Sequence, residues 1–441
     1  MFVAGKAWYY STMIVIEAKL KGTTTQYSKL DEAIRTGQFI RNTCLRYWED
    51  NKGVTRNDLQ KLCSVLAKNK ETPWTKKLNS QARQAHADRA WSAIQHFYEN
   101  CRLGKPGKKG YPKYKKFSRS VEYKNSGWKL SADRRQITFT DAFEVGTMDL
   151  WSSRDLVWYS EQQISRVRVV RRADGYYAQF LVDWDRREEH EFQGKMTGID
   201  LGLKEFYTDS DGNTVNNPRY LRKSERRLKM LQRRVSKKHV KGHIQSNRYH
   251  KARKSLALQH LKVSRQREDK ARKNALALVK SNDLIVYEEL KIRNMVKNHH
   301  LAKSISDASW YQFTQWLHYF AKVHGVIVIA VPPHNTTVDC SCCAAKVKKT
   351  LSTRTHKCSK CGTILDRDYN AAKNILAKGL KLLAEYLNGT VGHTESGAKS
   401  SKAQGETNLW LKNGDALALS WLDELRTKES WESPTIFGTP N

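Results

Sequence analysis

The chain has 441 residues and carries 79 Lys and Arg against 44 Asp and Glu, which gives a formal net charge of +35. At roughly 150 residues per domain, this length excludes a single small domain and suggests about three structural units. The positive surplus is typical of a protein that binds a polyanion, and the lack of any run of about 18 apolar residues argues against a membrane partner.

The N-terminal stretch and the cysteines indicate a reducing compartment. The apolar run Met13 to Ile16 is too short for the core of a signal peptide, so we expect the protein in the bacterial cytosol or nucleoid. Five of the eight cysteines lie between Cys340 and Cys361, which there favours metal binding over disulfides. The isolated Cys44, Cys63 and Cys101 are expected to be buried small hydrophobes.

Residues 12–190 predict a mixed, strongly basic half of the molecule. A strand is expected at Met13 to Leu20, followed by helical stretches. The segments Ile164 to Val170 and Tyr176 to Trp184 predict a hairpin that turns at Ala173-Asp174-Gly175. Apolar residues near helical spacing predict a helix over Ala82 to Cys101.

Lysines and aromatic residues interleave in the loop after this helix, from Lys108 to Phe117. Lysine can meet phosphates there, while the rings of Tyr111, Tyr114 and Phe117 can stack on unpaired bases. The loop is therefore a predicted contact with nucleic acid.

A second unit begins near Lys195, where the composition changes. Its first strand, Gly198-Ile199-Asp200-Leu201-Gly202, places one acid between glycines, and Phe206 to Thr208 with the turn Asp211-Gly212-Asn213 predicts a hairpin after it. Burying an unpaired carboxylate in an apolar strand costs free energy, so a bound metal ion would explain why an acid stands at Asp200. A position in a turn is the alternative.

The segment from Arg219 to Lys273 holds 21 Lys or Arg against three acids, with leucines spread through it. We predict long basic helices. A solvated charged face would explain any single turn, but a same-sign run of this length repels itself unless phosphates neutralise it. Contact with nucleic acid is the favoured interpretation.

An apolar strand, Asp283 to Tyr287, ends in two acids, Glu288 and Glu289. Because side chains alternate faces along a strand, the two acids point to opposite sides, and periodicity does not choose between them as metal ligands. A helix is expected over Ser309 to Gly325, with a core-packing stripe, before the strand Val326 to Val331. The stripe consists of Trp310, Phe313, Leu317, Phe320 and Val323.

Two CxxC pairs predict a structural zinc site. Cys340 and Cys343 form one pair, and Cys358 and Cys361 form the other, with fourteen residues between the pairs. Two such knuckles can close a tetrahedral Zn2+ site, and four thiolates leave no open position for water. Cys342 is a surplus thiol and His356 a possible substitute ligand.

A last helix is expected over Asp368 to Leu387. Asp368 stands where it begins, either as a metal ligand or as an N-cap, and Asp366 competes with it for the ligand role. From Gly389 onward the composition predicts a poorly ordered tail.

Three acids on separate elements are candidates for one site: Asp200, Glu288 and Asp368. Hydrolysis of a phosphodiester needs a nucleophilic water and stabilisation of the departing oxyanion, which two Mg2+ ions about 4 Å apart supply together. Carboxylate oxygens are the ligands that Mg2+ prefers, so such a site gathers acids from several elements.

The order of these features resembles the TnpB family of insertion-sequence-encoded RNA-guided nucleases, which is related to the miniature type V CRISPR effectors. The matching motifs are Gly198-Ile199-Asp200-Leu201-Gly202, Val286-Tyr287-Glu288-Glu289-Leu290, the two CxxC pairs and Asp366-Arg367-Asp368-Tyr369-Asn370-Ala371-Ala372-Lys373-Asn374-Ile375. The match spans about residues 195–388, and the basic segment from Gln84 to Tyr123 is less specifically similar to the family's recognition region. Cys342 departs from the usual pattern of the ribbon.

The resemblance implies an α/β fold, with an RNase H-like (RuvC) domain interrupted by a zinc ribbon and an N-terminal lobe formed by a β-barrel-like wedge and a helical recognition domain. It implies wedge and recognition regions over residues 1–194, nuclease segments at 195–335 and 365–388, the ribbon at 336–364 and a flexible tail at 389–441. It also implies that Asp200, Glu288 and Asp368 hold Mg2+, in preference to Glu289 and Asp366.

The function implied by the resemblance is RNA-guided cleavage of double-stranded DNA beside a short flanking motif, with guide RNA and target DNA as partners. Two other functions remain open. One is a nuclease-silent RNA-guided DNA-binding protein, such as a repressor. The other is a transposase that acts directly on the ends of its element.

Overall fold

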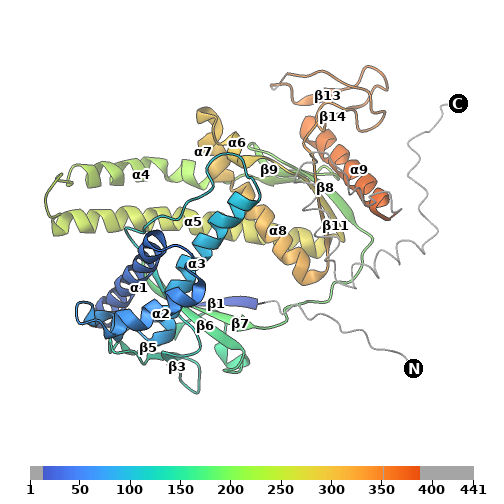
Figure 1. Ribbon diagram of the computed structural model, residues 1–441. Coiled ribbons are helices and arrows are strands. Elements are labelled where there is room, and N and C mark those ends of the chain that lie inside the picture. Colours follow the sequence, from blue (N-terminus) through green and yellow to red (C-terminus); the bar gives the residue numbers. More distant parts are fainter. Residues whose placement is uncertain (1–12, 351, 388–441) are drawn as a thin grey trace, which may run out of the picture. The chain divides into compact units, whose positions relative to one another are not determined.

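The computed structural model describes residues 13–350 and 352–387, and these divide into two compact units, one up to Arg186 and one from Arg187 onward (Figure 1). The tail expected at residues 389–441 lies outside the described residues. Within the described ranges, no helix is long and apolar enough to cross a membrane.

The first unit is built on a seven-stranded antiparallel sheet in the order β2-β6-β7-β1-β5-β4-β3. Its strands are β1 (Met13–Lys21), β2 (Ser120–Tyr123), β3 (Trp128–Leu130), β4 (Gln136–Phe139), β5 (Gly146–Trp151), β6 (Ile164–Arg172) and β7 (Gly175–Asp183). Buried and more exposed side chains alternate along β1, as they do in a strand with one covered face. The predicted first strand and the predicted hairpin, which is formed by β6 and β7, are both confirmed.

Three helices complete the core of this unit: α1 (Thr24–Asp50), α2 (Arg56–Lys68) and α3 (Ser80–Arg102), with short 3-10 turns η1 (Pro73–Lys77) and η2 (Leu156–Trp158). The helix predicted over Ala82 to Cys101 is confirmed as α3. α1 and α2 each begin with a capping box, in which the cap side chain and the third helical residue satisfy each other's backbone N–H groups.

The prediction for the isolated cysteines is right for two of them and wrong for the third. Cys44 and Cys63 are buried, but Cys101 is exposed. Cys101 lies in the last turn of α3, and the next two residues, Arg102 and Leu103, are also exposed. The end of this helix therefore extends beyond the core at Cys101.

The second unit contains a five-stranded mixed sheet in the order β10-β9-β8-β11-β12. The strands are β8 (Met196–Leu201), β9 (Glu205–Asp209), β10 (Thr214–Asn216), β11 (Leu284–Glu288) and β12 (Ile327–Val331). β8, β11 and β12 are parallel, whereas β8, β9 and β10 form the predicted antiparallel hairpin and its extension. The predicted α/β class therefore holds for this unit.

Helices cover both faces of this sheet. On one face, α5 (Asn247–Ser281), α7 (His299–Ala308) and α8 (Trp310–His324) pack against Ile199, Ile285 and their neighbours. On the other face, α9 (Arg367–Leu387) packs against Val286 and β12. α8 confirms the helix predicted before Gly325, and its apolar stripe is buried as expected.

The basic segment forms a long antiparallel hairpin of α4 (Tyr220–Ser236) and α5, which Figure 1 shows extending from the second unit. At 1.5 Å per residue, α5 is about 50 Å long. Leu228, Leu231 and Val235 of α4 are buried, while the lysines and arginines face outward. The prediction of long basic helices is confirmed.

Between β12 and α9, the chain forms a small ribbon with the short strands β13 (Thr355–Lys357) and β14 (Ile364–Asp366). A four-residue helix, α6 (Ile292–Met295), follows β11. The ribbon has few buried apolar side chains of its own, apart from Cys340 and Cys358. Its folding must therefore depend on something other than a hydrophobic core.

Candidate functional site: an acidic cluster beside a four-cysteine ribbon

Asp200 and Glu288 lie at the ends of two neighbouring parallel strands. β8 and β11 pair in the register Gly198 to Val286 and Ile199 to Tyr287. Continuing this register by one residue brings Asp200 opposite Glu288. Sequence alone places the two acids 88 residues apart, and the parallel pairing brings them to the same edge of the sheet.

A third acid, Asp368, reaches this edge because α9 lies directly on the sheet. A Cβ atom on Gly198 would be 2.3 Å from the carbonyl oxygen of Ala372, and one on Gly379 would be 2.4 Å from Cγ2 of Val286. Two glycines, one on the strand and one on the helix, thus permit the close approach. Asp368 stands one helical turn before Ala372 and so lies near the end of β8.

The two faces of the sheet distinguish Glu288 from Glu289. Ile285 and Tyr287 belong to the core under α5 and α8, whereas Val286 contacts α9. Side chains alternate along a strand, so Glu288 lies on the α9 face with Val286, and Glu289 does not. Glu288 is buried, and its carboxylate accepts a hydrogen bond from the hydroxyl of Thr336.

Asp366 and Asp368 have different roles at the start of α9. The carboxylate of Asp366 accepts hydrogen bonds from the backbone N–H groups of Asp368, at 2.8 Å, and Tyr369, at 3.4 Å. Asp366 is therefore the side-chain cap of the helix. Asp368 instead pairs with two arginines, Arg354 and Arg367, each at 3.0 Å.

Asp200 is the most perturbed member of the acidic cluster, which consists of Asp200, Glu288 and Asp368. Burial, followed by repulsion from the nearby carboxylates of Glu288 and Asp368, raises the pKa of Asp200 to about 8. Burial also raises the pKa of Glu288, while the Thr336 hydroxyl and Lys378 act in the opposite direction. Three hard oxygen donors with unfavourable mutual repulsion fit a divalent cation such as Mg2+.

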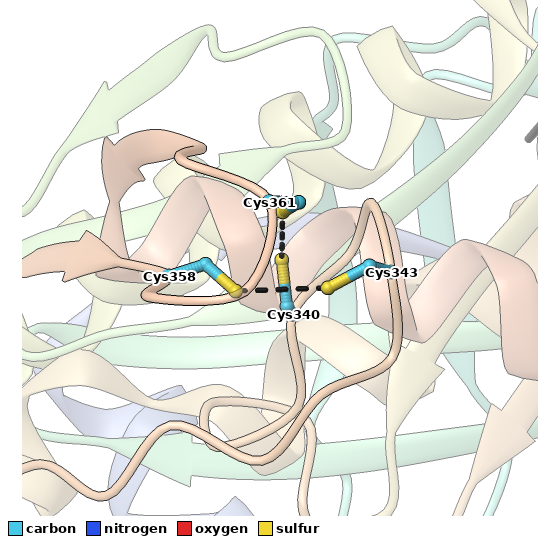
Figure 2. Close-up of side chains that lie close together, drawn as sticks. All are labelled: Cys340, Cys343, Cys358 and Cys361. Atoms are coloured by element: carbon cyan, nitrogen blue, oxygen red, sulfur yellow. Dashed lines mark hydrogen bonds between the residues drawn. The ribbon is translucent and has the colours of Figure 1, made fainter. Parts of the chain in front are cut away.

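The four cysteines of the ribbon lie together as two crossed pairs (Figure 2). The sulfur atoms of Cys340 and Cys361 are 3.7 Å apart, those of Cys343 and Cys358 are 3.6 Å apart, and all four lie within 4.8 Å of one another. A tetrahedral zinc site with Zn–S bonds of 2.3 Å has sulfur atoms about 3.8 Å apart, so the spacing fits Zn2+.

The described part of the chain holds no other group of three or more Cys, His, Asp or Glu ligand atoms gathered this tightly. The carboxylates of the acidic cluster therefore lie further apart than the four thiols do. Asp368 forms ion pairs with Arg354 and Arg367. Cys342 is exposed, and His356 is buried with its Nδ1 beside the ammonium of Lys349, so neither belongs to the group of four.

Two amides of α9 join the ribbon to the acidic cluster. Nδ2 of Asn370 donates to the carbonyl of Asp339 at 2.9 Å, and its Oδ1 accepts from the backbone of Ser341 at 3.0 Å. Nδ2 of Asn374 donates to the carbonyls of Thr336, at 2.8 Å, and Asp339, at 2.7 Å. Sequence reasoning missed Thr336, Asn370 and Asn374; the only signal was two asparagines spaced four residues apart after Asp368.

The aromatic residues of the basic loop do not all remain available for stacking. The hydroxyls of Tyr111 and Tyr114 both donate to Glu49, and the ring of Tyr111 packs against Trp48 and Phe97. Phe117 is 87% exposed. Of the three rings predicted to contact nucleic acid, the one at Phe117 is the most exposed.

Two family models match the chain. Residues 179–299 match a model described as "Probable transposase" (OrfB_IS605), and residues 310–375 match one described as "Cas12f1-like, TNB domain". The first match includes the strands β8 to β11 and the helices α4 to α6, with Asp200 and Glu288. The second covers α8, β12, the ribbon and the beginning of α9.

Curated relatives extend the likeness to the first unit. A protein of Streptomyces pristinaespiralis named RNA-guided DNA endonuclease is 34% identical over 277 residues, which is 61% of this chain and 66% of that protein, just under two thirds of its length. The RNA-guided DNA endonuclease InsQ of Escherichia coli K12 is 27% identical over 331 residues, or 71% of this chain and 78% of that protein.

Among solved structures, the mini-RNA-guided endonuclease CRISPR-Cas phi3 aligns with a TM-score of 0.51 at 8% identity, covering 83% of this chain and 92% of that chain. At this identity the likeness concerns the fold alone. It shows that the arrangement of elements is similar to that of a miniature CRISPR effector.

Proposed function

Because this chain belongs to the TnpB family, whose relatives include the miniature type V CRISPR effectors, we propose that it is an RNA-guided endonuclease that cleaves double-stranded DNA beside a short flanking motif. The observation that carries this proposal is the meeting of Asp200, Glu288 and Asp368 at one edge of the sheet. Relatives named RNA-guided DNA endonucleases support it.

In the proposed site, Asp200, Glu288 and Asp368 hold two Mg2+ ions, which supply a nucleophilic water and stabilise the departing oxyanion. The Thr336 hydroxyl orients the Glu288 carboxylate, and Asp366 fixes the first turn of the helix that carries Asp368. Burial, and after it repulsion from Glu288 and Asp368, raises the pKa of Asp200, so that this side chain keeps its proton until a cation takes its place.

The proposal assigns the mixed sheet and its helices to an RNase H-like (RuvC) domain, with segments at residues 195–335 and 365–388. The four-cysteine ribbon at residues 336–364 holds a structural Zn2+, and residues 1–194 form the wedge and recognition lobe. A single site then has to cut the two DNA strands one after the other. Guide RNA supplies the sequence specificity by base pairing, while lysines and arginines contact phosphates.

The direct test is cleavage of a matched, flanked plasmid by guide-loaded protein in Mg2+. Asp200→Ala should abolish cleavage while guide binding stays unchanged, and cleavage at the wild-type rate would exclude Asp200 from the site. Asp211→Ala, in the exposed turn between β9 and β10, is the matched control and should cut normally.

The same experiment separates the two alternatives. Wild-type protein that binds the plasmid in Mg2+ without cutting it would indicate a nuclease-silent DNA-binding protein. Protein freed of RNA that cuts the ends of its element would indicate a transposase.

A further inference from the structure

A cavity of about 500 Å3 lies in the second unit, beside the acidic cluster but distinct from it. It is bounded by the turn after β8, the start of α4, α7 and the ribbon residue Arg354. Leu203 in its wall is three residues after Asp200, so this part of the cavity is within about 10 Å of Asp200 along an extended chain. Arg354 contacts both the cavity and Asp368.

The lining of this cavity is strongly basic. Five cations line it, namely Lys204, Arg219, Arg222, Lys303 and Arg354, together with the acids Glu225 and Asp307. The charges do not cancel within the cavity, because five cations face two acids, and one of these acids, Asp307, pairs with Arg267 outside the lining.

Asp307 is buried and serves the structure of the cavity wall. Its carboxylate accepts the backbone N–H groups of Leu221 and Arg222 at the start of α4, and it pairs with Arg267 of α5 at 2.9 Å. These bonds tie α4, α5 and α7 together. They also occupy both carboxylate oxygens of Asp307, and its ion-pair partner is Arg267 and not a cation of the lining.

Glu225 pairs with Lys229 at 2.8 Å and with Lys303, and these two lysines hold its pKa at about 2. The side chains of Lys204 and Arg222 have no hydrogen-bond or ion-pair partner within the described ranges. Two cations on separate elements thus line the cavity, and in the described part of the chain neither has an ion-pair partner.

We propose that this cavity is a phosphodiester subsite, in which Lys204 and Arg222 bind a backbone phosphate of the DNA strand being cut, a few nucleotides from the scissile bond. This subsite rests on the proposed nuclease function. A guanidinium fork and an ammonium are the side chains that bind phosphate oxygens best. The DNA strand is the occupant because Arg354 lines the cavity and also pairs with Asp368, and because Leu203 in the cavity wall is three residues from Asp200.

The first test measures binding in the cleavage-deficient Asp200→Ala background, so that it does not depend on activity. Guide-loaded protein is titrated with a short single-stranded DNA at several salt concentrations. Lys204→Gln with Arg222→Gln should weaken binding about tenfold and reduce the salt slope by roughly 0.7, the value for one phosphate of a single strand that is no longer neutralised. Lys280→Gln, an exposed change at the end of α5 that lies outside both the cavity and the basic segment Arg219 to Lys273, is the control and should leave both quantities unchanged.

The second test locates the phosphate. Single neutral methylphosphonates are placed along the substrate strand, and one position near the cut should raise the KM of otherwise wild-type protein while kcat stays similar. In the Lys204→Gln, Arg222→Gln variant the same modification should have no further effect, and Lys204→Arg with Arg222→Lys should restore most of the sensitivity. Additive effects of the modification and the variant, or unchanged DNA binding, would overturn the subsite.

The outcomes distinguish the two proposals. If Asp200→Ala still cuts DNA, the proposed nuclease site fails, and the binding experiment alone decides the subsite. If the double variant loses guide RNA binding as well, its phosphate contacts serve the RNA, and the assignment to the DNA strand is wrong.

Discussion

The hydroxyl of Thr336 donates a hydrogen bond to the buried carboxylate of Glu288, while the backbone carbonyl of Thr336 accepts one from Asn374 at 2.8 Å. One residue at the entrance to the ribbon therefore touches both the strand and the helix that carry the proposed metal ligands. The ribbon and the acidic cluster are mechanically joined at this point.

Asn374→Ala removes both hydrogen bonds that Asn374 donates, to the carbonyls of Thr336 and Asp339. Loss of a buried hydrogen-bond partner costs about 1–3 kcal/mol, and Thr336 becomes free to move away from Glu288. We expect a cleavage rate about tenfold lower at limiting Mg2+, with partial recovery at high Mg2+. Rates measured across a Mg2+ titration check this, with the exposed Lys373→Ala as control; a rate reduced equally at all Mg2+ concentrations would contradict it.

Glu288→Gln and Glu289→Gln should behave differently although the residues are neighbours. Glu288 lies on the α9 face with Asp200, and Glu289 lies on the opposite face. Removing the charge of Glu288 should lower cleavage at least 100-fold without loss of folding, whereas the Glu289 variant should stay within about threefold of wild type. Single-turnover cleavage measures both, and the reverse ranking would reassign the ligand.

Cys342→Ser and Cys343→Ser provide a matched pair for the ribbon. Cys343 belongs to the four clustered thiols, and the adjacent Cys342 is exposed outside them. The Cys343 variant should lose most of its bound zinc and unfold at lower temperature, because the ribbon lacks a core of its own. Metal content by mass spectrometry and thermal unfolding give the readout. Equal zinc content in the two variants would count against the four-cysteine assignment.

His86 makes the stability of the first unit depend on pH. It is buried, and burial followed by repulsion from Arg89 lowers its pKa to about 3. Between pH 6.5 and 3 the unfolded chain binds a proton at this position that the folded chain does not, so the free energy of unfolding falls as the pH falls. From pH 7 to pH 5 the loss should be about 2 kcal/mol.

Urea unfolding of the wild type and of His86→Leu at these two pH values measures the effect. Leucine fills a similar volume without titrating, so the variant should lose about 2 kcal/mol less than the wild type over this interval. Parallel losses in the two proteins would show that His86 is not the responsible group.

Gly198→Ala tests the contact between β8 and α9. The added Cβ would lie 2.3 Å from the carbonyl oxygen of Ala372 and 2.6 Å from the nitrogen of Leu376, both of which are backbone atoms that cannot rotate away. The helix has to move, which we expect to cost roughly 1–3 kcal/mol and to displace Asp368. Thermal unfolding and cleavage should both be impaired, and wild-type cleavage would show that α9 has room to adjust.

Sequence patterns predicted the elements that local chemistry controls. The strand around Asp200, the basic helices, α8 ended by Gly325 and the two CxxC pairs all follow from periodicity, charge and spacing, and the structure contains each of them. The strands β2 to β5 were not predicted, because with three to six residues each they are too short to show a clear alternation. The sheet order was not predicted, because β1 pairs with β5 and β7, which lie more than 100 residues further along the chain.

Within the site, the sequence could not separate Glu288 from Glu289 because both faces of β11 are covered, so apolar residues occupy both sides of the strand. It could not separate Asp366 from Asp368 because either position suits a helix cap, and only the hydrogen bonds identify Asp366 as the cap. The contact between Thr336 and Asn374 was missed, because the spacing of Asn370 and Asn374 on α9 does not reveal which distant backbone carbonyl accepts their hydrogen bonds.

α9 can pack on the sheet only after the ribosome has synthesised the chain as far as this helix. About 170 residues separate Asp200 from Asp368, so at roughly 5–20 residues per second a ribosome adds the third acid on the order of ten to thirty seconds after the first. Until then, Gly198 has no helix above it and a nascent chain carries only two of the three carboxylates. On the proposed assignment of these acids, an incomplete chain lacks one ligand of the metal site, so we expect it not to cut DNA.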